Sequence, residues 1–61
     1  MNESFLINLG GTDIYSGEHV RRGRNRVIFR RVVIDIEGDY VEVADFNGKI
    51  HKCNPAELRR V

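Results

Sequence analysis

Several residue types are scarce in this chain of 61 residues, and each scarcity excludes a class of function. Cys53 is the single cysteine, so no intrachain disulfide can form, as expected of a protein in a reducing compartment. The only serines are Ser4 and Ser16, and no pattern of nucleophile, histidine and acid indicates covalent catalysis. No glycine motif of the phosphate-binding type follows a predicted strand. The sequence therefore predicts a binding protein that is not an enzyme and needs no cofactor.

Long apolar segments are also missing. No run approaches the ~20 residues that a membrane-spanning helix needs. The first residues include an acid, Glu3, where a signal peptide requires positive charge, and their apolar stretch is short. We therefore expect a cytoplasmic protein without a membrane partner.

Charge, by contrast, is abundant and separated by sign, although the formal net charge is only +1. Arginine dominates the basic residues, and its planar group of donors suits phosphate better than the lysine ammonium does. Residues 21–31 contain no acid and hold Arg21, Arg22, Arg24, Arg26, Arg30 and Arg31. Residues 35–45 contain no base and hold Asp35, Glu37, Asp39, Glu42 and Asp45. This separation predicts a basic surface that meets a polyanion and an acidic surface with another role.

Apolar and polar residues alternate in several short segments, which is the period of half-buried strands. Gly10 and Gly11 end the first strand, and Thr12-Asp13 continues that turn. Gly23 and Asn25 interrupt the pattern, so we assign the arginines of residues 21–26 to a loop. The expected strands cover residues 5–9, 17–20, 27–37 and 40–45, a segment after Gly48, and residues 59–61.

The longest expected strand changes the parity of its apolar residues in the middle. Val27 and Phe29 share one face of a regular strand, whereas Val32, Ile34 and Ile36 fall on the opposite face. One extra residue near Arg30-Arg31 restores a single apolar face, which is the effect of a β-bulge. The sequence therefore predicts a bulge at these two arginines.

Two hairpins are expected after the bulge. A two-residue reversal at Gly38-Asp39 sets Ile36 against Val41 and Ile34 against Val43. The same register sets Asp35 against Glu42, and like charges in such positions destabilise a strand pair. Lys52, a bound cation or a basic partner are the alternatives that would offset this repulsion.

The second hairpin allows two registers. A three-residue loop at 46–48, with Gly48 in the left-handed conformation, sets Asp45 against Lys49 and Glu42 against Lys52. It also sets Val41 against Cys53. A two-residue loop at Asn47-Gly48 loses both charge pairs. The first register is preferred, because each pair of opposite charges is worth about 0.2–1 kcal/mol.

A helical turn is expected before the last strand. Asn54 is a capping residue, Pro55 takes the first helical position, and Glu57 follows three residues after the cap. His51 and Cys53 lie two residues apart, but a structural zinc site needs about four ligands. We expect no metal site, and Cys53 is interpreted as a small core residue.

This order of elements resembles the SH3-like small barrels, which include KOW-type modules and integrase C-terminal domains. The resemblance covers residues 17–61 and uses the Gly17-to-Val20 opening, the two hairpins, and the closing pattern of Pro55, Leu58 and Val61. It implies an all-β fold: a small SH3-like five-stranded barrel with one helical turn before the last strand and an extra N-terminal strand. Residues 1–16 would form that strand and a glycine joint. Such modules commonly bind nucleic acid or proteins, and the few aromatic residues here argue against a methyl-lysine cage.

Three kinds of partner follow from these features. The first hypothesis is a nucleic acid, DNA or RNA, bound by an arginine-rich loop. Its candidate residues are Arg21, Arg22, Arg24, Asn25, Arg26, Arg30 and Arg31. The alternative is a phage or mobile-element accessory protein that binds and modulates a host protein through its charged surfaces. Its candidate residues are Asp35, Glu37, Tyr40, Glu42 and Phe46. A third hypothesis is a homodimer that pairs through the Phe5–Leu9 segment.

Overall fold

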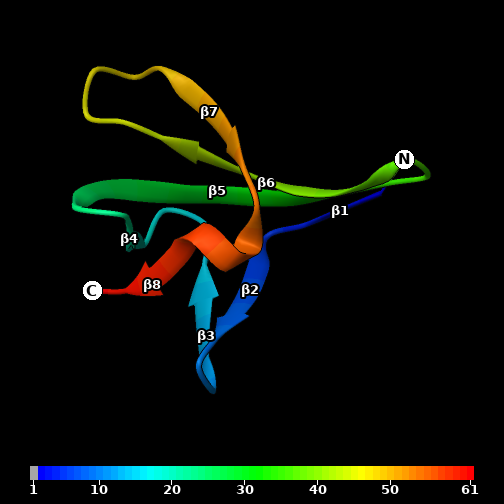
Figure 1. Cartoon of the computed structure of the whole chain (residues 1–61), viewed down its shortest axis with the longest axis horizontal. Helices are drawn as coiled ribbons and strands as arrows, with labels where there is room; N and C mark the ends of the chain where they lie inside the picture. The colour runs from blue at the N-terminus through cyan, green and yellow to red at the C-terminus, as the bar shows by residue number, and fades with distance from the viewer. Residues whose placement is uncertain (1) are drawn as a thin grey trace.

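The computed structural model describes residues 2–61, and in these residues every strand pairing is antiparallel (Figure 1). The strands are β1 (Asn2–Ser4), β2 (Leu6–Leu9), β3 (Thr12–Tyr15), β4 (His19–Arg22), β5 (Asn25–Asp35), β6 (Gly38–Ala44), β7 (Ile50–Cys53) and β8 (Leu58–Arg60). One 3-10 turn, η1 (Pro55–Glu57), precedes β8. The all-β prediction and the turn before the last strand are confirmed.

The main sheet is built around the long strand β5. Its order is β7-β6-β5-β4-β8, and β1 also pairs with β5. No pairing between β7 and β8 closes this sheet within residues 2–61, so the structure is an open sheet here and no closed barrel is seen. Strand β1 lies along the C-terminal half of β5, with Glu3 opposite Val33, whereas β4 lies along the N-terminal half.

The N-terminal segment differs from its prediction. The expected strand at residues 5–9 is divided, because Phe5 separates β1 from β2. Thr12-Asp13 belongs to strand β3 and not to a turn. Gly10 and Gly11 alone make the reversal, both with positive φ (58° and 87°), and this favours the two-residue turn that matches the twist of paired strands. Strands β2 and β3 thus form a second, two-stranded sheet, so β3 occupies one edge of β2.

One core lies between the two sheets. It contains residues of the main sheet together with Leu9 of β2 and Ile14 of β3. The core members are Leu9, Ile14, Val20, Val27, Phe29, Val41, Val43, Cys53 and Leu58. Phe29 and Cys53 are buried as predicted. The β2–β3 hairpin therefore covers the inner face of the curved main sheet.

The predicted bulge is present. The register between β5 and β6 shifts between Phe29 and Arg31, so Arg30 is the extra residue. Val32 then faces the core and packs against it, but Ile34 is 43% exposed and Ile36 is 99% exposed. The bulge corrects the parity for Val32, yet β5 and the turn after it extend beyond the core and leave Ile34 and Ile36 in solvent.

The register of the first hairpin was predicted wrongly. Asp35 pairs with Gly38, so the turn consists of Ile36 and Glu37 instead of Gly38 and Asp39. Glu42 consequently faces Arg31, not Asp35. The observed register pairs opposite charges at this position and removes the like-charge repulsion that the predicted register carried. It also sets Val32 against Val41, two apolar residues of the same face.

The second hairpin and the helical turn were predicted correctly. Val41 pairs with Cys53 and Glu42 with Lys52, and Gly48 has a φ of 86°. At η1 the Asn54 side chain accepts a hydrogen bond from the Ala56 amide (2.9 Å), and Glu57 accepts one from the Asn54 amide (2.7 Å). Both are local arrangements of turn and cap chemistry, which explains why sequence alone sufficed.

Candidate functional site

The arginines expected in a loop lie mostly on paired strands. Arg21 and Arg22 belong to β4, and Asn25 and Arg26 belong to β5. Only Gly23 and Arg24 form the turn. Gly23 has a φ of 63°, and a glycine at the first turn position joins strands through a two-residue turn. The loop assignment is therefore wrong, because one glycine in the required conformation reverses the chain without a longer loop.

Three arginines stand in line across three strands. Arg21 on β4 pairs with Arg26 on β5 and with Arg59 on β8. Residues directly opposite one another share a face, so the three side chains lie on one side of the sheet. We call this set, Arg26, Arg21 and Arg59, the arginine row. The chain neighbours Val20, Val27 and Leu58 are buried, and strand alternation therefore directs the row outward.

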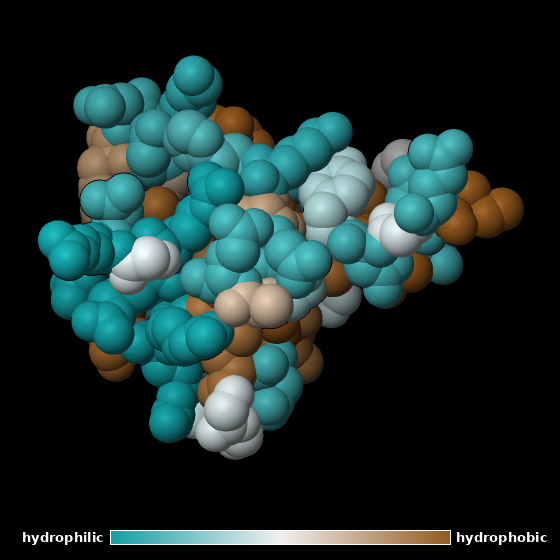
Figure 2. Space-filling view, viewed as in Figure 1, coloured by the Kyte–Doolittle hydropathy of each residue, from teal (hydrophilic) through white to brown (hydrophobic). Residues whose placement is uncertain are grey.

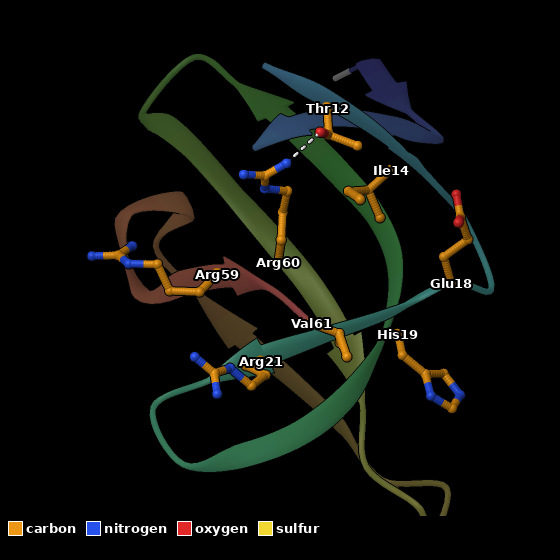
Figure 3. Close-up of a pocket in the computed structure, with 8 residues that line it drawn as sticks. All are labelled: Thr12, Ile14, Glu18, His19, Arg21, Arg59, Arg60 and Val61. Atoms are coloured by element: carbon orange, nitrogen blue, oxygen red, sulfur yellow. Dashed lines mark hydrogen bonds between the residues drawn. The ribbon is translucent and has the colours of Figure 1, made fainter. Parts of the chain in front are cut away.

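Within residues 2–61 the row lacks acidic partners. Among the described residues, neither Arg21, Arg26 nor Arg59 forms an ion pair. The Arg59 guanidinium donates to the carbonyl oxygens of Ala56 (2.8 Å) and Leu58 (2.9 Å) through one nitrogen. Figure 3 shows the guanidinium groups of Arg21 and Arg59 extending toward the same side of the sheet. Like charges opposite each other destabilise a strand pair, so the fold carries this row at a cost.

The other basic side chains divide into engaged and free groups. Arg22 forms an ion pair with Glu57 (3.4 Å), and the Arg60 guanidinium donates to the Thr12 hydroxyl (2.7 Å), as Figure 3 shows. Arg31 lies between two carboxylates and donates to Glu42 (2.5 Å) and to Glu3. Arg24 and Arg30 are exposed and form no ion pair with any of residues 2–61.

An open hollow adjoins the arginine row (Figure 3). It has a volume of about 870 Å³ and lies among β3, β4 and β8. Its lining residues are Thr12, Ile14, Glu18, His19, Arg21, Arg59, Arg60 and Val61. The one acid of this lining, Glu18, already accepts a hydrogen bond from the Tyr15 amide (2.7 Å). The hollow therefore presents a basic rim with a small apolar floor.

The sequence did not identify Arg59, Arg60 and His19 as parts of this site. Arg59 and Arg60 stand on the predicted last strand, so their presence on a strand was visible. Their position beside Arg21 depends on the pairing of β8 with β4, and no pattern within either strand predicts that pairing. The resemblance to small barrels was the one indication that the last strand could pair with β4 and bring these arginines to Arg21.

An aromatic pair lies at the next position along the same face. His19 precedes Arg21 by two residues on β4, and its ring meets the Phe46 ring edge to face, with centroids 5.4 Å apart and an interplanar angle of 83°. Phe46 is 61% exposed. Sequence reasoning placed Phe46 with the acidic candidates, but the structure brings it to His19, near the arginine row.

The remaining acidic candidates do not form one surface. Asp35, Glu37 and Asp39 surround the β5–β6 turn and form no ion pair with the described residues. We call these three acids, with Ile34 and Ile36, the acidic tip. It forms the end of the molecule opposite the β4–β5 turn (Figure 1), and Figure 2 shows hydrophobic surface at that end.

Glu42 and Tyr40 stand nearer the middle of the sheet. The Arg31 guanidinium holds the pKa of the Glu42 carboxyl below its ordinary value, chiefly through their hydrogen bond. The two carboxylates in turn raise the pKa of Arg31. The Lys52 ammonium lies 4.8 Å from the centre of the Tyr40 ring. These contacts give both residues intramolecular partners and separate them from the acidic tip.

Metal binding and cysteine chemistry are two further candidate activities for residues 2–61. No three side chains of histidine, cysteine, aspartate or glutamate converge as a metal site there. The Cys53 thiol is buried in the core, and burial raises its pKa, which disfavours the nucleophilic thiolate. Over the same residues no helix has the length and apolarity to cross a membrane.

No protein-family model matches the sequence, and comparisons with curated proteins and with solved structures gave no match.

Proposed function

We propose that this protein is a cytoplasmic, non-enzymatic module that binds the phosphates of a nucleic acid through its arginine row. The observation that carries the proposal is the alignment of Arg26, Arg21 and Arg59 without acidic partners in the described part of the chain. Adjacent strands lie about 4.8 Å apart, so the backbones of the three arginines form one closely spaced line, and all three positively charged side chains start from the same face of the sheet. A polyanion offsets the repulsion along this line, and binding releases its condensed counterions.

Basic side chains next to the arginine row support its proposed role in phosphate binding. Arg24 extends the basic surface at the β4–β5 turn, and Arg60 and the Arg22–Glu57 pair border it. Arginine suits this role better than lysine, because its planar group donates two hydrogen bonds to one phosphate. Arg31 contributes less, since Glu3 and Glu42 already accept its hydrogen bonds.

We further propose that residues 17–61 are an open member of the SH3-like small barrels. This is supported by the sequence of strands β4 to β7, the turn η1, and the return of β8 to pair with β4. The β2–β3 hairpin would then be an addition to the module that supplies Leu9 and Ile14 to its core. Such modules commonly bind nucleic acids or proteins, in agreement with the arginine row.

A salt-dependent titration of the full chain with fluorescent DNA and RNA tests the proposed function. Affinity is expected to fall with salt, with a log–log slope of about −0.9 per contacted phosphate on duplex DNA and about −0.7 on a single strand. The triple variant Arg21→Ala, Arg26→Ala and Arg59→Ala should lose this binding. Absence of any binding at low salt by the unaltered protein would rule the proposal out.

A matched pair of single variants locates the surface. Arg26→Ala and Arg30→Ala each remove one exposed arginine of β5 that has no ion pair among residues 2–61. Both have the same effect on net charge, but only Arg26 belongs to the row. Arg26→Ala is expected to lower affinity and to reduce the salt slope by about one contact, whereas Arg30→Ala changes both less. Equal losses would show that net charge, not the row, drives binding.

The acidic tip supports a second candidate function, the binding of a protein. Ile36 is 99% exposed in the β5–β6 turn, and the carboxylates that flank it form no ion pair with any of the described residues. This combination suits a partner with an apolar depression and a basic rim, because opposite charges orient the encounter. Capture of a protein from nuclease-treated lysate, abolished by Ile36→Asp but retained by Arg26→Ala, would support it. Loss of the captured proteins on nuclease treatment would count against it.

A further inference from the structure

We propose that the arginine row belongs to a single-strand site, in which a base stacks on Phe46 while the adjoining phosphates contact the arginines. The inference rests on the proposed function and specifies its ligand. It starts from one face of β4, where His19 and Arg21 project on the same side. Two residues along a strand span about 6.6 Å, so the aromatic pair begins immediately beside the row.

Phe46 is positioned for stacking and not for the core. The buried side chains of β6 end at Ala44, and Phe46 stands two residues later with 61% of its surface exposed. The edge-to-face contact with His19 orients the ring, while the exposed part of its surface remains open to a ligand. An aromatic face of this kind accepts any base, because every base has a π face.

The loop that carries Phe46 is held by hydrogen bonds. The Asp45 carboxylate accepts from the amides of Asn47 (2.9 Å) and Lys49 (3.0 Å) through one oxygen, and its other oxygen contacts the His51 ring at 2.8 Å. The Asp45 amide also donates to the Lys49 carbonyl (3.0 Å). Phe46 therefore projects from an ordered turn, which reduces the conformational entropy lost when a base stacks on it.

The combination of these features selects a single strand over a duplex. In a duplex the bases are stacked on one another, so an exposed phenylalanine beside the phosphate-binding groups gains no contact with a base face. On a single strand the same ring replaces a lost base–base stack, while the arginines follow the backbone. Duplex binding would use the arginine row alone.

The test compares three ligands of equal length, about twelve nucleotides, within the usual site sizes of single-strand binders. They are a thymidine oligomer, the same backbone with abasic sites, and a duplex; a uridine oligomer provides the RNA equivalent. Each is titrated by fluorescence anisotropy with the full chain and with Phe46→Ala, Phe46→Tyr and Phe5→Ala. Phe5 is a matched control, because it is similarly exposed (54%) but lies between β1 and β2.

Phe46→Ala is expected to weaken binding of the base-containing single strand about tenfold, in the range reported for loss of one stacked base. Phe46→Tyr should retain binding, and Phe5→Ala should not alter it. Affinity for the abasic strand should be lower at the outset and unaffected by Phe46→Ala. Thermal unfolding of each variant verifies that the fold is intact.

The outcomes separate the two proposals. If all ligands bind with the expected salt dependence, but Phe46→Ala weakens the abasic strand or the duplex as much as the thymidine oligomer, the stacking site is wrong and the arginine row stands. If Phe46→Ala has no effect on any ligand, the conclusion is the same. If no ligand binds at low salt, the proposed function itself fails.

Discussion

The two ends of β5 carry opposite charge, but they differ more in what lies beneath them. At the N-terminal end, the arginine row is supported by the buried side chains of Val20, Val27 and Leu58. At the C-terminal end, β1 and β6 flank β5, and Ile34 and Ile36 of the acidic tip are exposed. A row backed by the core is held in position before a ligand arrives, whereas no residue of the acidic tip belongs to the core.

The same comparison explains why the basic end is the stronger candidate site. Like charges opposed across three strands persist only because the packing on the other face outweighs their repulsion. The acids of the tip are spread around a turn and do not oppose one another in register. The arginine row and three of the acids of residues 35–45 thus lie at opposite ends of β5, but only the basic end is built on the core.

The largest expected effect comes from the support under the row. Leu58→Ala removes a side chain that is only 2% exposed, and such losses cost about 2–5 kcal/mol. Ile36→Ala at the acidic tip should change stability by less than about 0.5 kcal/mol. Urea unfolding of both variants measures the difference. Similar losses at the two positions would contradict the view that only the basic end rests on a core.

A smaller effect of opposite sign is expected within the row. Arg21→Glu places an acid between Arg26 and Arg59 and converts two repulsive pairs into attractive ones. Each converted pair should contribute about 0.2–1 kcal/mol of stability, while affinity for nucleic acid falls. Thermal unfolding and a binding titration of the same variant measure the two changes. A less stable variant would show that repulsion within the row does not destabilise the fold. A variant that binds as tightly as the original would show that Arg21 does not contact the phosphates.

The smallest effect concerns the stability of the fold in acid, through Glu42 near the sheet centre and Glu57 at the basic end. The hydrogen bond from Arg31 lowers the pKa of Glu42, and the Asn54 amide lowers the pKa of Glu57. A carboxyl with a lower pKa in the folded state stabilises the fold at pH values above its unfolded pKa, near 4.5. That stabilisation is lost as the pH falls through the lower folded value.

Substitution assigns this loss of stability to each carboxyl. Glu42→Gln near the sheet centre and Glu57→Gln at the basic end should each make stability less dependent on pH below about 4.5. Both variants should be less stable than the original at neutral pH and approach it in acid. Unfolding curves between neutral and acid pH provide the measurement, and a pH dependence unchanged by both substitutions would contradict these pKa directions.

Local chemistry made much of the fold predictable. The bulge at Arg30 followed from the parity of apolar residues, and the second hairpin followed from Asn47-Gly48 and its two charge pairs. The predicted register of the first hairpin was wrong. Gly38-Asp39 has the residue types of a tight turn, but the observed turn is Ile36–Glu37, and Arg31 pairs with Glu42. The register that forms pairs Arg31 with Glu42 and Val32 with Val41, and these pairs outweigh the preference of Gly38-Asp39 for a turn.

The sequence by itself determined the all-β class, the capped turn at Asn54, and the segregation of charge along the chain, because each depends on neighbours within a few residues. Only the tertiary structure decided that Arg59 lies beside Arg21, that Phe46 meets His19, and that Glu3 shares Arg31 with Glu42. These contacts join segments distant in the chain. They are selected when β8 and β1 dock on a common sheet, and the burial of core residues, not any local pattern, drives that docking.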